Sequence, residues 1–237
     1  MNILIVGING KMGQNLKNVA ENNNHKIIAG IDVKPDLKNN IFNNFNLPKS
    51  IIEQIDIVID FALPNALKDE LDFCTRHNKK LIICSTGHSK EQLTLIEKAC
   101  KKIPIFKTTN TSLGIAFILK ILTDNLGILN EYDIGILEKH HLQKKDAPSG
   151  TAKSILQALS PLKKDVFCHS IRAGNVAGEH EIMLFFGEEQ IYIKHIAQSR
   201  KLFAQGAVKI INFMQTQNQK KLYNMQDLLH FKLSQKN

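Results

Sequence analysis

Residues 1–110 alternate short apolar segments with segments whose apolar residues recur at helical spacing. The apolar segments predict strands at Ile3–Val6, Lys26–Asp32, Asp56–Phe61, Leu81–Ser85 and Ile103–Phe106. Helices are expected between them, at Lys11–Glu21, Pro64–His77 and Lys90–Lys101. Apolar strands separated by helices form a parallel sheet that is covered on both faces. Ligands bind such α/β sheets beyond the carboxyl ends of the strands, so functional residues are expected there.

The pattern changes after Asn110 and predicts a second domain of the α+β class. The expected elements are a helix at Leu113–Leu126, a strand at Asp133–His140, a helix at Thr151–Leu159, antiparallel strands at His180–Phe186 and Gln190–Ala197, a helix at Leu202–Met214 and a last segment at Leu222–Leu233. We therefore expect a first domain at residues 1–111 and a second at residues 112–207. Residues 208–237 are expected to return to the first domain.

Composition narrows the classes of partner. The chain has 237 residues, enough for one large or two ordinary domains. Its formal net charge of +9 favours anionic ligands. The lysines are scattered and form no basic tail, so we expect no nucleic-acid partner. No apolar run approaches the length of a membrane span, and the first apolar segment is too short for a signal peptide. A cytoplasmic protein without a membrane partner is expected.

The cysteines carry no signature of metal binding. Cys74, Cys84, Cys100 and Cys168 show no C-x-x-C spacing. We interpret them as reduced thiols, which are typical of cytosolic proteins, and expect neither a disulfide framework nor a metal site.

A glycine-rich segment, GINGKMG, directly follows the first predicted strand, from Gly7 to Gly13. Its spacing is a variant of the dinucleotide-binding fingerprint. The first glycine permits a tight turn, and the later ones let the backbone approach a pyrophosphate and the helix pack on the sheet. A strand before the segment and a helix after it favour this interpretation over a turn without a ligand.

Asp32 ends the second predicted strand, about 20 residues beyond the glycines, where dinucleotide-binding folds carry a ribose-binding acid. A carboxylate at this place accepts hydrogen bonds from the adenine-side ribose and repels a 2′-phosphate. Lys34 could attract such a phosphate. An ordinary turn residue at a strand end is the structural alternative. The pattern favours NADH as the cofactor and leaves NADPH open.

Two further segments of small residues, STG at Ser85–Gly87 and TTNTSLG at Thr108–Gly114, also follow predicted parallel strands. Both should therefore lie at the ligand-binding edge of the sheet. Small hydroxylated residues and a glycine admit a flat nicotinamide ring and offer it hydrogen bonds. Either segment taken alone fits an ordinary loop equally well.

The segment EKHHLQKKDAPSGTA, Glu138–Ala152, combines two adjacent histidines, a lysine and the start of a helix. Imidazole transfers protons near neutral pH, and a lysine can hold or protonate an anion. Pro148 ends the preceding strand, and Ser or Thr caps the helix. Backbone N–H groups at a helix start that contains a glycine can approach an anion closely. The combination favours an enzyme that acts on a small acid over a strand–turn–helix with a basic surface.

The segment RAGNVAGEH, Arg172–His180, predicts a sharp bend between strands. Glu179 fits a structural ion pair, whereas Arg172 and His180 are candidates for supporting the site. Arg200 fits a capping or hinge role as well as a ligand role.

Together these motifs resemble the 4-hydroxy-tetrahydrodipicolinate reductase (dihydrodipicolinate reductase) family of bacterial lysine and diaminopimelate synthesis. The resemblance rests on VGINGKMG, STG, TTNTSLG, EKHHLQKKDAPSGTA and RAGNVAGEH, in the family's order from Val6 to His180, and on SRKLFAQGA near residue 200. The HH-x-x-K-x-DAPSGTA element is the most specific of them. The resemblance implies a Rossmann-like first domain, a second domain for substrate binding and tetramer formation, and a nicotinamide cofactor.

The resemblance also implies roles for individual residues. The proton donors fall on His140 and Lys144, and the substrate-binding residues fall on His141, Ser149, Gly150 and Thr151. The cofactor positions fall on Gly7, Ile8, Asn9, Gly10, Lys11, Met12, Asp32, Cys84, Ser85, Thr86, Gly87, Thr108, Thr109, Asn110 and Thr111.

The chain departs from the family pattern at three places. The family usually has Gly-Thr-Thr-Gly where this chain has Cys-Ser-Thr-Gly at Cys84–Gly87, and often an aromatic residue where it has Thr111. The segment between Leu159 and Arg172 is also shorter than in relatives. None of these departures removes a proposed catalytic group.

The resemblance therefore implies a homotetrameric reductase that transfers a hydride from NADH or NADPH to 4-hydroxy-tetrahydrodipicolinate, a small dicarboxylate, giving tetrahydrodipicolinate. One alternative is a non-catalytic nucleotide sensor with a basic surface, whose affinity for nucleic acid would fall steeply with salt. The other is a different reductase on the same fold, such as a semialdehyde dehydrogenase. That enzyme would need a nucleophilic cysteine, for which Cys84 is the nearest candidate.

Overall fold

The computed structural model describes residues 1–234, which form two compact units. The first unit comprises Met1–Thr111 together with the described residues from Phe203 onwards, and the second unit comprises Ser112–Leu202. The second unit thus ends at Leu202 and not at residue 207. Which ligand each unit binds stays a prediction. Within residues 1–234, no helix has both the length and the apolar character needed to cross a bilayer.

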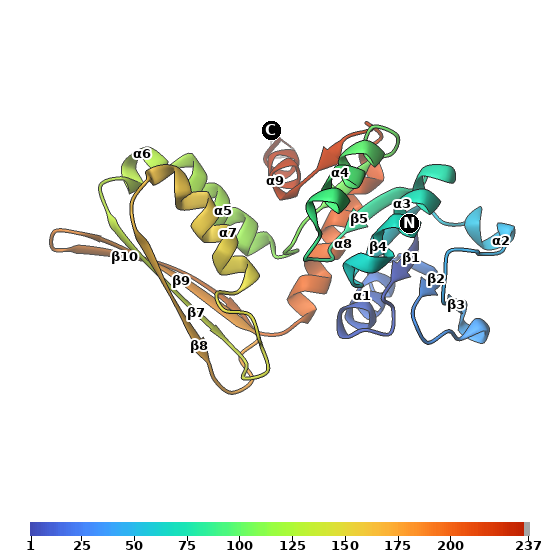
Figure 1. Ribbon diagram of the computed structural model, residues 1–237, viewed down its shortest axis with the longest axis horizontal. Helices are drawn as coiled ribbons and strands as arrows, with labels where there is room; N and C mark the ends of the chain where they lie inside the picture. The colour runs from blue at the N-terminus through green and yellow to red at the C-terminus, as the bar shows by residue number, and fades with distance from the viewer. Residues whose placement is uncertain (235–237) are drawn as a thin grey trace. The chain divides into compact units, whose positions relative to one another are not determined.

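The first unit is built on a seven-stranded sheet in the order β11-β6-β5-β4-β1-β2-β3 (Figure 1), with neighbouring strands parallel. The strands are β1 (Asn2–Val6), β2 (Lys26–Ile31), β3 (Ile41–Phe42), β4 (Ile57–Asp60), β5 (Lys80–Ile83), β6 (Ile105–Lys107) and β11 (Leu222–Tyr223). The chain proceeds from β1 toward one edge of the sheet and from β4 toward the other. The point between β1 and β4 is therefore the topological switch at which such sheets bind ligands. This sheet confirms the predicted α/β, Rossmann-like class.

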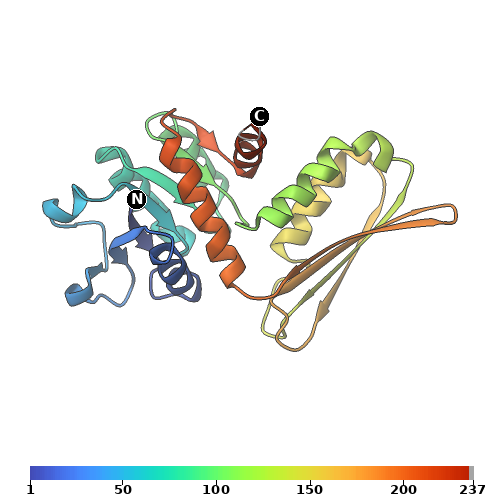
Figure 2. The same cartoon turned by 180° about the vertical axis from the view of Figure 1, so that it is seen from behind.

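Helices cover both faces of this sheet. They are α1 (Lys11–Glu21), α2 (Lys49–Ile52), α3 (Leu67–Arg76), α4 (Lys90–Ala99), α8 (Lys201–Thr216) and α9 (Met225–Ser234). On one face, strand residues such as Leu4 and Leu81 pack with Leu71 of α3 and Ile96 of α4. On the other face lies α8 (Figure 2), whose Phe213 meets Phe106 edge-on with the ring centroids 6.0 Å apart.

The second unit contains a four-stranded mixed sheet in the order β10-β9-β7-β8. Its strands are β7 (Asp133–His140), β8 (Val166–Arg172), β9 (Gly178–Phe186) and β10 (Glu189–Ala197). β7 is parallel to β8 and antiparallel to β9. Strand β8 was not predicted, because the mixed sequence VFCHSIR has no clean alternation of apolar and polar residues. The supposed loop before Arg172 is thus largely an edge strand.

Only one face of this mixed sheet is covered by helices within the unit. α5 (Leu113–Asp124) and α7 (Gly150–Leu159) pack on it, with α6 (Leu126–Leu129) following α5. Their core joins Leu122 and Ile155 to Ile136 and Ile182 of the central strands. The other face carries exposed apolar side chains on both edge strands: Phe167, Ile171, Tyr192 and Ile196.

Candidate functional site

The glycine-rich turn after β1 has the geometry that its sequence predicted. Gly7 has a φ of +78°, in the region that favours glycine, and its N–H donates to the carbonyl of Ile31 at 2.8 Å. A Cβ at Gly13 would lie 2.3 Å from the carbonyl oxygen of Gly7, so no side chain fits there. The glycines therefore let α1 start close against the turn, which leaves its first backbone amides beside the switch point.

Asp32 follows β2 and is fixed beside this turn. Its carboxylate accepts hydrogen bonds from the backbone N–H of Asn9 at 3.0 Å and of Lys34 at 3.3 Å. The side-chain amide of Asn9 donates to the carbonyl of Lys34 at 3.2 Å. The structure thus brings Gly7–Met12 and Asp32 together, as a dinucleotide site requires.

The STG segment follows β5, where it meets a residue that the sequence analysis did not assign. The Ser85 hydroxyl donates a short hydrogen bond to Asp60, the last residue of β4, and lies 3.2 Å from Nε2 of His88. Asp60 also accepts from the N–H of Ala62 at 2.7 Å. Burial raises the pKa of Asp60, while the hydrogen bonds from Ser85 and Ala62 oppose that shift. Asp60 therefore ties together the loops after β4 and β5.

The TTNT segment follows β6 at the same sheet edge. The Thr108 hydroxyl donates to the carbonyl of Asn110 at 2.7 Å, and the Thr111 hydroxyl donates to the carbonyl of Phe203 at 2.7 Å. Since β1, β2, β5 and β6 all belong to one parallel sheet, the four predicted cofactor segments lie at its carboxyl edge.

Cys84 has no character of an activated nucleophile. Burial raises the pKa of its thiol well above the usual range, and the negative charges of Asp60 and Glu70 add to the effect. A thiol of this kind stays protonated at neutral pH, and only the thiolate is an effective nucleophile. All four cysteines are free. This setting argues against the semialdehyde dehydrogenase alternative.

In the second unit, strand β7 changes character along its length. Alternate residues face the helices: Ile134 and Ile136 contribute to the core, whereas Glu138 and His140 continue the same buried face toward the turn before α7. Glu138 has no exposed surface, and His140 is also buried. A strand position that normally holds an apolar side chain therefore holds a carboxylate.

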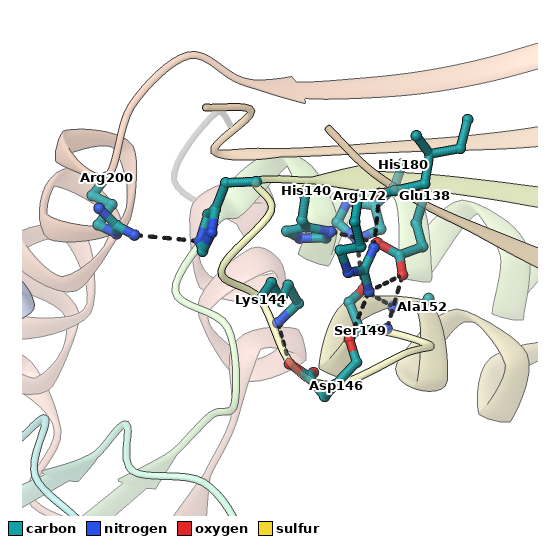
Figure 3. A network of polar contacts seen from close by, with 11 residues as sticks. Glu138, His140, Lys144, Asp146, Ser149, Ala152, Arg172, His180 and Arg200 are labelled. Atoms are coloured by element: carbon teal, nitrogen blue, oxygen red, sulfur yellow. Dashed lines mark hydrogen bonds and ion pairs between the residues drawn. The ribbon is translucent and has the colours of Figure 1, made fainter. Parts of the chain in front are cut away.

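Glu138 is the centre of a network of polar contacts (Figure 3). One carboxylate oxygen forms a short hydrogen bond with Nδ1 of His140. The other accepts from Nη2 of Arg172 at 2.7 Å and from the backbone N–H of Ser149 at 3.2 Å. The sequence analysis gave Glu138 no role, although its position two residues before His140 places both side chains on one face of a strand.

The network sets the charges of its members. Burial by itself would raise the pKa of Glu138, but hydrogen bonds from Arg172, Ser170 and His140 outweigh it and lower the pKa to about 2. Burial lowers the pKa of His140, and Glu138 opposes that shift without cancelling it. Glu138 is therefore ionised at neutral pH, beside an imidazole that is easily deprotonated.

His180 of β9 lies against this pair. The ring centroids of His140 and His180 are 5.2 Å apart, with their planes nearly perpendicular at 73°. Nε2 of His180 is 3.1 Å from the Ser149 hydroxyl. Burial and the neighbouring His140 lower the pKa of His180 to about 4, so its ring is neutral at pH 7.

The loop between β7 and α7 carries the predicted lysine. Lys144 Nζ lies 2.8 Å from Oδ1 of Asp146, and Arg172 donates to the carbonyl of Asp146 at 2.6 Å. Nε2 of His141 lies 3.5 Å from a guanidinium nitrogen of Arg200, so these two side chains are neighbours.

Helix α7 begins at Gly150, immediately after this loop. The Ser149 hydroxyl caps it by accepting from the N–H of Ala152 at 3.2 Å. The first amides of a helix have no partner four residues earlier within the helix. No other atom lies within 4 Å of the place that a Cβ on Gly150 would occupy, so a ligand can approach the backbone there. The turn therefore has the geometry of an anion cradle.

Glu138, His140 and His180 also offer three ligand atoms within 4.8 Å of one another, as a metal ion would need. The donor set fits such an ion poorly, however. Both carboxylate oxygens already accept hydrogen bonds, one of them from the Arg172 cation. A divalent cation would have to displace the His140 contact next to that guanidinium, which electrostatic repulsion opposes. We therefore interpret the trio as part of a hydrogen-bond network.

Comparisons with known proteins show which family the chain resembles. The family profiles described as dihydrodipicolinate reductase, N-terminus, and dihydrodipicolinate reductase, C-terminus, match residues 1–111 and 114–229. The 4-hydroxy-tetrahydrodipicolinate reductase of Clostridium tetani is 37% identical over 248 residues, which cover 96% of each chain. That of Alkaliphilus oremlandii is 36% identical over 250 residues, covering 97% of this chain and 99% of the relative.

A solved structure shares the fold. Dipicolinate-bound dihydrodipicolinate reductase from Paenisporosarcina sp. TG-14 has a TM-score of 0.79 and 23% sequence identity, covering 94% of this chain and 97% of that one. The two profiles together cover most of the chain, and the relatives are more than 30% identical over nearly all of it, so they show more than a shared fold. The chain therefore belongs to the dihydrodipicolinate reductase family.

Proposed function

We propose that the protein reduces 4-hydroxy-tetrahydrodipicolinate to tetrahydrodipicolinate with a nicotinamide cofactor, as a step of diaminopimelate and lysine synthesis. The observation that carries the proposal is the buried Glu138–His140 pair beside a helix start and Lys144. That arrangement joins a proton donor to an anion cradle. The curated relatives bear the name of this reductase.

The overall reaction consumes one hydride and one proton for each water released. The ring hydroxyl leaves as water, and a hydride takes its place on the ring. A bound nicotinamide supplies that hydride, and the protein supplies binding, orientation and electrostatics. In this proposal the Gly7–Met12 turn holds the pyrophosphate and Asp32 the adenine-side ribose. The Cys84–Gly87 and Thr108–Thr111 segments surround the nicotinamide. NADH is the favoured cofactor, because the Asp32 carboxylate repels a 2′-phosphate.

His140 is the proposed proton donor, acting through Nε2, because Nδ1 is engaged by Glu138. The lowered pKa of His140 makes its protonated form a stronger acid than an ordinary imidazolium, and two substrate carboxylates nearby would favour that form. Lys144 is the second candidate, as a proton donor or as a positive charge that orients the substrate. Most of the rate then comes from holding substrate and cofactor in reactive positions.

The substrate carboxylates are proposed to bind at Ser149, Gly150 and Thr151, with His141 and Lys144 beside them. The amides at the start of α7 and a lysine charge together favour a carboxylate. Dipicolinate, the ligand named for the Paenisporosarcina structure, is a planar ring with two carboxylates. The same chemical class is expected here.

We also propose a homotetramer, built through the uncovered face of the second sheet. Phe167 is 67% exposed and Tyr192 is 53% exposed on this face, and apolar area of this kind is typical of protein interfaces. Light scattering coupled to size-exclusion chromatography tests the stoichiometry. Phe167→Lys should lower the molar mass of the assembly, because a charge would be buried in the interface. We also predict a cytoplasmic location. The four free thiols are compatible with it.

The test of the function is a coupled assay. The substrate is generated enzymatically from its precursors, and the oxidation of NADH is followed by absorbance, then repeated with NADPH. Turnover with either cofactor supports the proposal. Cofactor binding without turnover would instead favour the sensor alternative, as would binding to nucleic acid that weakens steeply with salt.

A further inference from the structure

We infer that Glu138 is a positioning residue of the reductase: its carboxylate orients the His140 ring so that Nε2 exchanges the proton, and it holds the anion cradle at the same time. The inference rests on the proposed function, because it takes His140 as the proton donor. It adds a residue to which the sequence motifs had given no role.

Burying the Glu138 carboxylate costs free energy of folding. An ionised side chain with no exposed surface is strongly destabilising unless charges and hydrogen bonds compensate it. Arg172 on β8 supplies the opposite charge, with its Nη2 2.7 Å from Oε1 of Glu138. Its other donors include His140 on β7 and the backbone N–H of Ser149 at the start of α7. The partners of one buried carboxylate therefore include the proposed proton donor and the first residue of the proposed cradle.

The Glu138 carboxylate also fixes the tautomer of His140. An ionised carboxylate only accepts hydrogen bonds, so the facing Nδ1 must carry a hydrogen. The neutral ring then has its lone pair on Nε2, and the protonated ring has a proton on Nε2 to transfer. A Cβ at Gly178 would lie 3.1 Å from Nε2, so the glycine leaves space beside that atom. The negative charge of Glu138 also stabilises the imidazolium, as the acid of a catalytic triad does.

Glu138 also connects strand β7 to the start of α7. The carboxylate oxygen that accepts from Ser149 N–H also accepts from Arg172. The hydroxyl of the same serine caps the helix and contacts His180. Glu138 therefore sets the position of the ring relative to the helix start. A purely structural ion pair with Arg172 would need neither contact, and the two readings differ in measurable ways.

The wild-type protein provides the first test. Nitrogen NMR of protein labelled with ¹⁵N-histidine reports which ring nitrogen carries the hydrogen, and His140→Ala assigns the signal. We expect the neutral His140 ring to be the Nδ1–H tautomer. The Nε2–H tautomer would overturn the inference. This measurement needs neither substrate nor turnover, so it decides the geometry even if the proposed reaction is wrong.

The second test is Glu138→Gln, compared with Glu70→Gln. Glu70 is equally buried, belongs to the first unit and is not among the residues proposed to bind substrate or cofactor, so it controls for the loss of a buried carboxyl group. We expect Glu138→Gln to lower kcat about 10²-fold, a typical contribution of acid catalysis, with the KM for NADH little changed. The descending limb of the kcat–pH profile should move to lower pH, because the imidazolium has lost its counter-charge. Glu70→Gln should leave both kcat and the profile unchanged. A Glu138→Gln profile that keeps its wild-type limb would overturn the inference.

A double-mutant comparison separates the inference from the proposed function. If Glu138 acts through His140, Glu138→Gln should cost much less in the His140→Ala background than in the wild type. An equal loss in both backgrounds would overturn the positioning role and leave the reductase assignment intact. A wild-type protein without turnover would instead refute the proposed function. If Glu138→Gln does not fold, the tautomer of the wild type still decides.

Discussion

The side chains of Lys144 and Asp146 form an ion pair, with 2.8 Å between Nζ and Oδ1. Burial alone would raise the pKa of Asp146, but the hydrogen bond and charge of Lys144 outweigh it and lower the pKa. Asp146 is therefore ionised at neutral pH. It pairs with Lys144, the lysine that we propose binds the substrate. A dicarboxylate ligand has to compete with it.

Asp146→Asn should therefore strengthen the binding of pyridine-2,6-dicarboxylate. A partly exposed ion pair contributes up to about 1 kcal/mol, which corresponds to about a fivefold gain in affinity. Calorimetric titration with NADH bound measures it. Asp124→Asn removes a comparable ion pair, with Lys120 at 2.7 Å, and should leave the affinity unchanged. Weaker binding by Asp146→Asn would mean that Asp146 positions Lys144 instead.

Lys144→Ala and His140→Ala should each lower kcat far more than they weaken cofactor binding. General acid catalysis typically raises the rate about 10²–10⁴-fold, so its loss should appear in kcat. Cofactor binding should change little, because both residues lie outside the unit that carries the glycine-rich turn. Steady-state kinetics and a fluorescence titration with NADH measure the two effects. Near wild-type turnover in both variants would refute their assignment as proton donors.

NADH should be used at least as well as NADPH. The Asp32 carboxylate, fixed by the Asn9 and Lys34 amides, repels a 2′-phosphate, and the Lys34 side chain offsets this only in part. Asp32→Ala should shift kcat/KM toward NADPH. Kinetics with both cofactors decide the matter. A strong NADPH preference in the wild type that Asp32→Ala leaves unchanged would remove Asp32 from the ribose role.

Thr151→Val should weaken the binding of pyridine-2,6-dicarboxylate, because it removes a hydroxyl from the first turn of α7. Titration with NADH bound compares the variant with the wild type. Thr94→Val makes the same chemical change on α4, where the hydroxyl donates to the carbonyl of Lys90, and serves as the control. Equal affinity of wild type and Thr151→Val would contradict the carboxylate cradle.

Glu70→Gln should make the protein more stable than the wild type, increasingly so as the pH rises. Burial, helped by the charge of Asp60, raises the pKa of Glu70 well above its usual 4.5 in the folded state. The folded state then holds a proton that the unfolded state releases, so wild-type stability falls as the pH rises above about 4.5. Urea unfolding at pH 5 and pH 8 measures the difference. The exposed Glu97→Gln should show no such trend.

Much of the fold was predictable because apolar periodicity reports burial directly. The five strands and three helices expected within residues 1–110 and the strand at Asp133–His140 were found to within a few residues, whereas the short helix α2 was not expected. β3 and β11 were missed, because two-residue strands such as Ile41–Phe42 are too short for any period. β8 was missed because an edge strand with an exposed face keeps no clean pattern.

The site was predictable in its motifs and not in its connections. The positions of His140, Lys144 and Ser149 followed from a short contiguous segment, which a sequence displays directly. Asp60 and Ser85 meet across adjacent strands, and Arg172 reaches Glu138 from β8. Contacts of this kind depend on strand register and are invisible before the sheet is known.

The buried face of strand β7 is apolar at one end and polar at the other, so substitutions at the two ends should have different effects. Ile134 and Ile136 pack in the core, whereas Glu138 and His140 belong to the polar network. Substitutions at the apolar end, which packs against α5 and α7, are expected to change the free energy of unfolding without touching the polar network. At the polar end stability and turnover are linked, because the same buried carboxylate of Glu138 pairs with Arg172 and holds the ring that we propose as the proton donor.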